Sequence, residues 1–195
     1  MKTKRFLMLG LIAGALCLGG CGNKENNANQ NSNANPSENG GGQNPPAPLT
    51  LLETLKAKAK SMASRILNKS ESAITFAEYE GETADADVYY YDSTNLTFVD
   101  VEIYKESFDT NFADNLKAYL PSNAALTYSD DVLDYLDDYG MAWYDRYYSD
   151  GEYTYNIYVE AYDEDDIYPA ETYGCIFIFK TSQETAFDNY MSSEE

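Results

Sequence analysis

The sequence contains no histidine, and this absence removes several classes of enzyme from consideration. Triad hydrolases use histidine as their general base, and most catalytic zinc sites use it as a ligand. The chain also has no GxGxxG, P-loop or CxxC motif, so nothing indicates a dinucleotide, a nucleoside triphosphate or a redox dithiol. We therefore expect a protein that is not an enzyme and that needs no cofactor.

Cysteine is scarce, with three residues in a chain of 195. Cys175 lies in the apolar stretch "YGCIFIFK", where cysteine behaves as a small buried hydrophobe. A catalytic thiol needs a base to activate it, and the absence of histidine removes the usual one. Cys17 and Cys21 lie four residues apart near the N-terminus, and the residues around them decide their interpretation.

The chain also lacks an apolar run of membrane-spanning length at its N-terminus. Residues 6–20 form an uncharged run of 15 residues, which is short of the roughly 20 that a spanning helix needs. Lys2, Lys4 and Arg5 precede this run, and small residues end it. This order of charge, apolar run and small residues is typical of a secretory signal peptide.

The stretch Leu18-Gly19-Gly20-Cys21 resembles the lipobox of bacterial lipoproteins. The resemblance implies that Cys21 carries diacylglycerol and that residues 1–20 are cut off just before it. Cys17 does not fit this pattern, because Leu16 is too large for the cut site. The alternative is an ordinary signal peptide with a coincidental cysteine. With Cys21 lipidated, we expect the protein on the cell membrane, facing outside the cytoplasm, or on the outer membrane of an organism with two membranes.

Aromatic residues are absent from residues 21–50, which contain nine asparagines, four prolines and a triple glycine. Such a segment cannot bury enough apolar surface to offset the entropy of ordering it. We expect a disordered tether that spaces a folded domain from the membrane. The domain itself is expected to occupy residues 51–195.

Positive charge is rare in most of that domain. Residues 71–195 contain 30 acidic residues against four cations, a net charge of −26. Nucleic acid is excluded as a partner, because its phosphates need clustered lysine and arginine. An acidic surface is compatible with basic partners, cations or neutral glycans, or serves only solubility.

The hydrophobic pattern predicts secondary structure over most of the domain. Residues 73–80 fit either a helix or a strand. The expected elements are an amphipathic helix over 51–67, a hairpin over 87–105, a short helix over 111–121, a helix over 129–140, a hairpin over 141–162, a central strand over 171–180 and a helix over 182–191.

This order predicts an α+β fold, in which an antiparallel sheet carries the N-terminal helix and the short helices on one face. The layout resembles small exported modules of the cystatin-like and PepSY-like kinds. Three uses compete for the basic helix over 51–67, namely packing on the domain's own sheet, lying on anionic lipid and binding a partner. We favour the first, because its lysines would face an acidic body.

The second hairpin contains the candidate binding surface. Asp150-Gly151 is expected to form a two-residue type I′ turn, so that paired positions sum to 301. One face, with residues such as Ala142, Tyr155 and Ile157, is then expected to be core. The other face brings together the candidate site residues Trp143, Asp145, Tyr147, Asn156 and Tyr158.

Three interpretations of that second face remain open. A helix covers it and makes Trp143 part of the core, or it is a protein interface, where tyrosine and tryptophan are enriched, or its rings stack on a glycan. We expect a binding or scaffolding domain, with an envelope protein as the favoured partner and a glycan as the alternative.

The acidic residues could form a calcium site or the active site of a hydrolase. The run Asp163-Glu164-Asp165-Asp166 suits calcium, but Ile167 and Tyr168 occupy positions where an EF-hand loop needs Asp or Asn and Gly. We therefore expect a solvated turn and no metal. A hydrolase based on two carboxylates is a second alternative, but the sequence nominates no pair.

Overall fold

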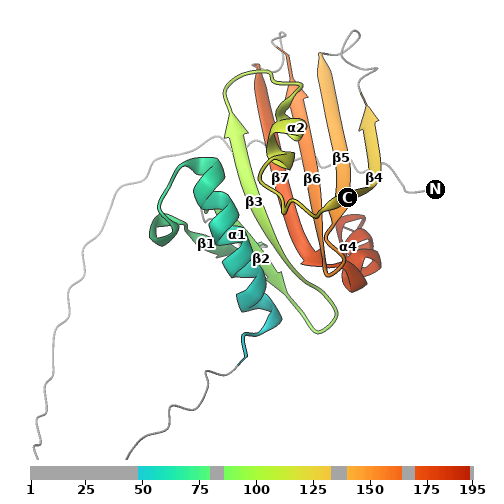
Figure 1. The fold of residues 1–195 in the computed structure, drawn as a ribbon. Helices are drawn as coiled ribbons and strands as arrows, with labels where there is room; N and C mark the ends of the chain where they lie inside the picture. The colour runs from blue at the N-terminus through green and yellow to red at the C-terminus, as the bar shows by residue number, and fades with distance from the viewer. Residues whose placement is uncertain (1–47, 80–85, 133–139, 164–169, 194–195) are drawn as a thin grey trace, which may run out of the picture.

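The computed structural model describes residues 48–79, 86–132, 140–163 and 170–193, which form one seven-stranded sheet flanked by helices (Figure 1). The strand order is β1-β2-β3-β7-β6-β5-β4. Cys21 and most of the expected tether lie outside the described residues. The strands are β1 (Phe76–Glu78), β2 (Val88–Asp92), β3 (Thr97–Lys105), β4 (Ala125–Val132), β5 (Met141–Ser149), β6 (Tyr153–Tyr162) and β7 (Glu171–Lys180). The helices are α1 (Leu51–Leu67), α2 (Phe112–Lys117) and α4 (Glu184–Met191), with 3₁₀ turns η1 (Glu71–Ala73) and η2 (Thr181–Gln183).

α1 begins at a capping box. The backbone N–H of Glu53 donates to the Thr50 hydroxyl at 3.2 Å, and the Glu53 carboxylate accepts from the Thr50 N–H at 2.7 Å. Leu55, Ala59 and Met62 lie buried on the sheet-facing side. Packing on the domain's own sheet is therefore confirmed as the use of this helix.

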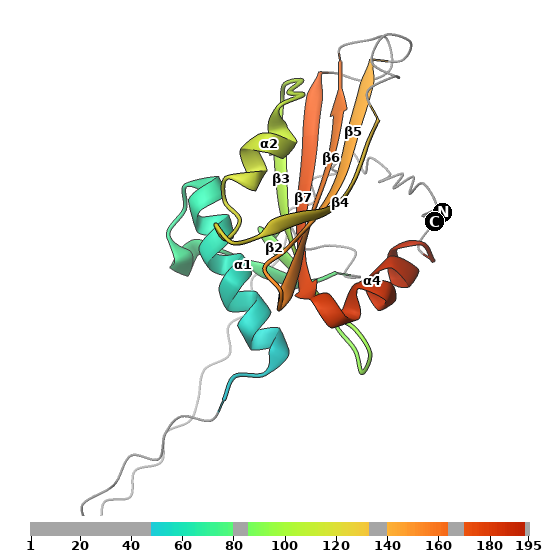
Figure 2. The same cartoon turned by 45° about the vertical axis from the view of Figure 1, so that its right-hand side comes forward.

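The helices lie on both faces of the sheet, so the prediction that they share one face was wrong. α1 and α2 lie on one side and α4 on the other (Figure 2). The cause is β7, the middle strand, whose Ile176 and Ile178 join the apolar cluster under α1 and α2. Its Phe177 and Phe179 join a second cluster under α4. A strand that is apolar on both faces needs cover on both.

The sheet is mixed, and the prediction of an antiparallel sheet was also wrong. β1 runs parallel to β2, whereas every other pair of strands is antiparallel. The carboxylate of Asp87 accepts from the backbone N–H and the hydroxyl of Thr75, both at 3.1 Å, and Thr75 accepts from the Asp87 N–H at 3.0 Å. These reciprocal bonds hold the starts of the two strands side by side, which sets the parallel direction.

The helix predicted over 129–140 is not observed where the structure describes the chain. Residues up to Val132 belong to β4, and residues 133–139 lie outside the described residues. Strand pairing outweighs the local helical pattern here. Tyr128 makes an edge contact with Tyr147 of β5, and Asp131 accepts a bidentate bond from Arg146.

The second hairpin turns one residue later than predicted. The N–H of Asp150 donates to the carbonyl of Tyr153 at 3.1 Å, so Gly151 and Glu152 form the turn. The Asp150 carboxylate stabilises this turn by accepting from the N–H groups of Glu152 and Tyr153, at 3.0 and 2.7 Å. Paired positions therefore sum to 303. The shift of two keeps every side chain on its predicted face, and the predicted core face is buried.

The close approach of α2 to Gly174 of β7 yields a stability prediction. A Cβ atom at Gly174 would lie 2.8 Å from Phe112 Cε1 and 3.1 Å from Leu116 Cδ1. Both side chains are buried, at 3% and 1% exposure, so neither can move aside freely. We expect Gly174→Ala to lower the free energy of unfolding by about 1–3 kcal/mol, measured by urea denaturation.

The double variant Gly174→Ala with Phe112→Leu is the control for this mechanism. Phe112→Leu removes the ring that the new methyl group would meet. The losses of unfolding free energy in the two single variants should therefore sum to more than the loss in the double variant. Simple additivity would show that the ring is not the obstacle.

Candidate functional site

The side of the sheet that packs against α4 concentrates the aromatic and acidic side chains of the domain. We call it the tyrosine face. Its members follow from the strand register, in which directly paired residues share a face. They include Tyr79, Tyr89, Tyr91, Phe98, Asp100, Glu102, Tyr104, Tyr173, Cys175, Phe177, Phe179, Asn156, Tyr158, Glu160, Tyr162, Trp143, Asp145, Tyr147, Tyr128 and Asp130.

Charge is segregated between the two sides of the sheet. Among the described residues, neither the strand side chains of the tyrosine face nor α4 contributes a lysine or arginine. The cations of the strands lie on the opposite side. Lys105 lies over the ring of Phe112 of α2, and Arg146 pairs with Asp114 of the same helix. The lysines of α1 lie there too, with Lys56 Nζ 3.2 Å from the ring centroid of Tyr90.

The five residues predicted from the hairpin all lie on the tyrosine face, but they differ in accessibility. Tyr147 and Asn156 are each 1% exposed, and Tyr158 is 7% exposed. Trp143 and Asp145 are half-buried. The hydroxyl of Tyr147 donates to Asp188 of α4 at 2.9 Å, so this ring holds the helix against the sheet.

Trp143 and Tyr158 do not form the pair across the two strands that the predicted register would give. Tyr158 lies opposite Asp145, and Trp143 lies opposite Glu160. The Tyr158 hydroxyl donates to Glu160 at 2.5 Å, and Asn156 Nδ2 donates to Asp145 at 2.5 Å. Burial raises the pKa of Glu160, and the hydroxyls of Tyr158 and Tyr162 act in the opposite direction by donating to it. Trp143 and Tyr158 are therefore diagonal neighbours and not a facing pair.

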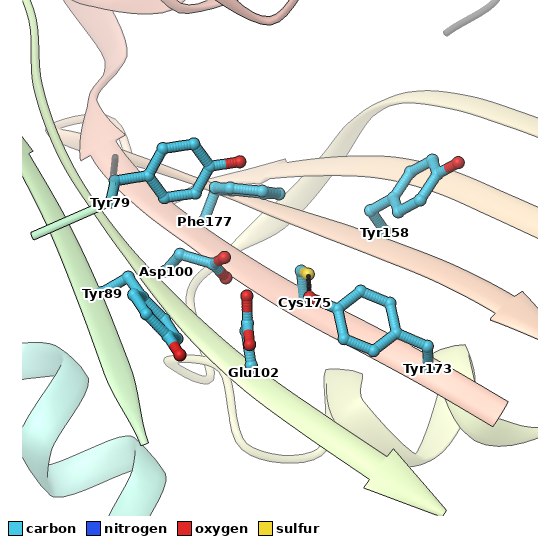
Figure 3. A pocket seen from close by; sticks show the side chains of 8 residues that line it. All are labelled: Tyr79, Tyr89, Asp100, Glu102, Tyr158, Tyr173, Cys175 and Phe177. Carbon is cyan, nitrogen blue, oxygen red and sulfur yellow. Dashed lines mark hydrogen bonds between the residues drawn. The ribbon is translucent and has the colours of Figure 1, made fainter. Parts of the chain in front are cut away.

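A hollow of about 310 Å³ opens on the tyrosine face where β1, β2, β3, β7 and β6 come together (Figure 3). Aromatic rings form most of its lining, and two carboxyl groups from alternate positions on one side of β3 point into it. The residues that line it are Tyr79, Tyr89, Asp100, Glu102, Tyr158, Tyr173, Cys175 and Phe177.

Asp100 is the unusual member of this lining. It is 1% exposed, and among the described residues its Oδ1 finds no hydrogen-bond partner. A buried carboxyl oxygen without a partner is destabilising in a folded protein. Burial raises the pKa of Asp100 well above its usual range, and the charge of Glu102 raises it further, while the nearby Cys175 thiol acts in the opposite direction.

The thiol and three of the phenols that line the hollow are held in their neutral forms. The thiol of Cys175 donates to the Tyr173 hydroxyl at 3.0 Å. Burial raises the pKa of Cys175 well above its usual range, and Asp100 and Glu102 raise it further. Burial likewise raises the pKa values of Tyr79, Tyr158 and Tyr173. The sulfur is thus a protonated, buried group, as expected from the sequence, and it has no nucleophilic character.

Sequence reasoning missed Asp100 and Glu102, because they alternate with Val99, Val101 and Ile103, and such alternation is typical of a strand that buries only its apolar face. A signal for the burial of Asp100 was nevertheless present. The apolar residues of β7 on both faces require a covered second face, and Asp100 pairs directly with Phe177 of that strand.

Comparison with known proteins finds no family model, no curated protein and no solved structure that matches the chain. In the described ranges, no helix is long and apolar enough to cross a membrane, and no group of three or more Cys, Asp and Glu residues is arranged to hold a metal ion. The acidic residues 164–166 lie outside these ranges.

The raised pKa of Asp100 yields a pH prediction. The folded state holds this proton more tightly than the unfolded state, so stability falls as pH rises from the unfolded pKa of about 3.9 toward the raised folded pKa. Asp100→Asn removes this loss. We expect the variant to gain stability relative to the parent as pH rises from 5 to 8, by at most about 1.4 kcal/mol per pH unit.

Urea denaturation at several pH values measures this gain. Asp92→Asn, an exposed carboxyl on the same sheet, is the matched control and should show no such trend. The titratable groups that line the hollow with Asp100 are Glu102, Cys175, Tyr79, Tyr89, Tyr158 and Tyr173. A gain that is constant with pH would show that Asp100 is ionised in the folded protein.

Proposed function

We propose that this chain is a bacterial lipoprotein, anchored through Cys21, that displays a non-catalytic binding domain on the tether over residues 21–50. The partner is an envelope protein with a basic patch, and it binds the tyrosine face. The observation that carries this proposal is the segregation of charge: among the described residues, the tyrosine face combines carboxyl groups and aromatic rings without a strand lysine or arginine.

The chemistry of this face fits a protein partner. Tyrosine and tryptophan are enriched in protein interfaces, because each combines a large apolar body with a polar tip. Complementary charge speeds encounter and excludes wrong partners. Tyr104 is 57% exposed on this face, and its hydroxyl is held by Glu171 at 2.7 Å, so its ring is presented in a defined orientation.

The two alternatives from the sequence have weaker support. A glycan platform made of Trp143 and Tyr158 needs two open, facing rings, whereas Tyr158 is 7% exposed and lies diagonal to Trp143. A carboxylate hydrolase would use Asp100 and Glu102, the only two carboxyl residues among those that line the hollow. Both carboxyl groups come from the same side of one strand, however, whereas the two carboxyl groups of a glycosidase flank the bond that is cleaved.

The anchor is tested by fractionation. We expect Cys21→Ser to move the protein from the membrane fraction to the soluble fraction, because one thioether-linked lipid is lost. Cys17→Ser is the matched control and should remain with the membrane. Membrane retention of the Cys21→Ser protein would contradict the anchor.

Partner binding is tested by pull-down with the tagged full chain from detergent-solubilised envelope. We expect a protein whose capture weakens with added salt and falls at least fivefold in Tyr104→Ala and in Trp143→Ala. Tyr104 is exposed, so its variant keeps the fold even if Trp143→Ala does not.

Leu126→Ala is the control for that experiment, because Leu126 is a 53% exposed apolar residue on the opposite side of the sheet. Capture that Leu126→Ala reduces equally, or capture that neither aromatic variant reduces, would remove the tyrosine face as the binding surface. Retention of the chain by an envelope polysaccharide, lost in Trp143→Ala, would favour the glycan alternative instead.

A further inference from the structure

The hollow around Asp100 brings together a buried carboxyl oxygen that has no donor among the described residues, a second carboxyl group and several aromatic rings. We propose that it binds the ammonium group of a primary amine, supplied by a lysine side chain of the partner protein. This inference rests on the proposed binding role of the tyrosine face, and it adds the chemical group that this face recognises.

The first argument is the unsatisfied carboxyl group. Oδ1 of Asp100 is buried and, in the part of the chain that the structure describes, has no donor, although the side chain lines a hollow. Such a group is a destabilising feature that binding can relieve. An ammonium supplies three N–H donors together with the charge that a carboxylate in this position requires.

The second argument is the spacing of the two carboxyl groups. Asp100 and Glu102 lie two residues apart on the same side of β3, which places their Cα atoms roughly 6.5–7 Å from one another. Figure 3 shows both carboxyl groups pointing into the same space. One compact ammonium nitrogen can donate to both, at about 2.8 Å to each. A planar guanidinium prefers a bidentate bond to one carboxylate, so this spacing favours lysine over arginine.

The third argument is the aromatic wall. Tyr79, Tyr89 and Tyr173 line the hollow beside the carboxyl groups, and the faces of such rings attract cations. The domain already uses this interaction on its other side, where Lys56, Lys58 and Lys117 lie over tyrosine rings.

A metal ion fits this arrangement less well. Calcium takes six to eight oxygen ligands and magnesium demands an octahedron, whereas the described residues that line the hollow include two carboxyl residues, Asp100 and Glu102. The rest of the lining consists of phenols, one protonated thiol and a phenylalanine ring. An apolar, ring-lined hollow with two carboxyl groups matches a cation that also carries an apolar chain, such as the lysine side chain.

Binding is linked to proton release. Without a cation beside it, the Asp100 carboxyl keeps its proton to a higher pH than usual, because burial and the charge of Glu102 raise its pKa. When the ammonium enters, Asp100 gives that proton to solvent and its carboxylate accepts an N–H from the ammonium, so the ion pair replaces the O–H bond. Affinity should therefore rise with pH below the raised pKa, by at most about tenfold per pH unit. The facing groups are Glu102, Cys175, Tyr79, Tyr89, Tyr158 and Tyr173.

The test uses two small probes that differ only in the ammonium group, Nα-acetyl-lysine methylamide and Nα-acetyl-norleucine methylamide. Each is titrated into the full chain in neutral detergent micelles, with NMR shifts of the protein as readout. We expect the lysine probe to bind in the millimolar range and at least tenfold more tightly than the norleucine probe. Its affinity should increase from pH 6 to pH 8.

Two variants locate the site. Asp100→Asn should weaken the lysine probe at least tenfold and remove the pH dependence, and Glu102→Gln should weaken it severalfold. Asp92→Asn removes the same charge from an exposed position outside the hollow and should leave the affinity within twofold.

Three outcomes overturn the proposal. Equal binding of the two probes would show an apolar pocket. Equal weakening by Asp92→Asn would show a general field effect of the acidic domain. Binding of calcium that Asp100→Asn abolishes, together with no binding of the lysine probe, would show a metal site. The pull-down tests the protein-binding role of the tyrosine face through other residues, Tyr104 and Trp143. Failure of the lysine proposal therefore does not decide whether the tyrosine face binds a protein.

Discussion

The double-sided burial of β7 is the constraint on which the rest of the structure depends. Ile176 and Ile178 require cover from α1 and α2, while Phe177 and Phe179 require cover from α4. A domain without a disulfide among its described residues obtains its stability from these two clusters. The short length of α4 then matters for function, because eight residues cover only part of the tyrosine face.

In the part of that face that α4 does not cover, a carboxyl group is buried beside aromatic rings, and its burial is destabilising. Asp100 pairs directly with Phe177, so the same register that buries the aromatic ring also buries a carboxyl group. A leucine at this position would be compatible with the apolar second cluster and would carry no desolvation cost. The protein thus carries a locally unfavourable group at the edge of its core, which is the kind of feature found where a fold serves a ligand.

Much of the fold could be predicted from the sequence, because the signals were local and repeated. The stripe of Leu55, Ala59 and Met62 and the apolar run of β7 identify α1 and the central strand. The orientation of β1 could not be predicted, because three residues show no alternation and its direction depends on Thr75 and Asp87, which are far apart in sequence. The site was predicted in part. The alternation of side chains along the second hairpin places Trp143 and Asp145 on the tyrosine face. The burial of Asp100 could be predicted only from knowing that β3 pairs with β7.

The position of the capping box has a consequence for how the domain is presented. Thr50 and Glu53 fix the point at which the chain enters α1, and α1 lies on the side of the sheet opposite α4. If Cys21 holds the chain at the membrane, the pull of the anchor is applied behind the sheet. The tyrosine face then lies on the side of the sheet opposite the helix to which the tether leads. A pull transmitted along the chain through Thr50 then acts on α1 before it reaches the tyrosine face.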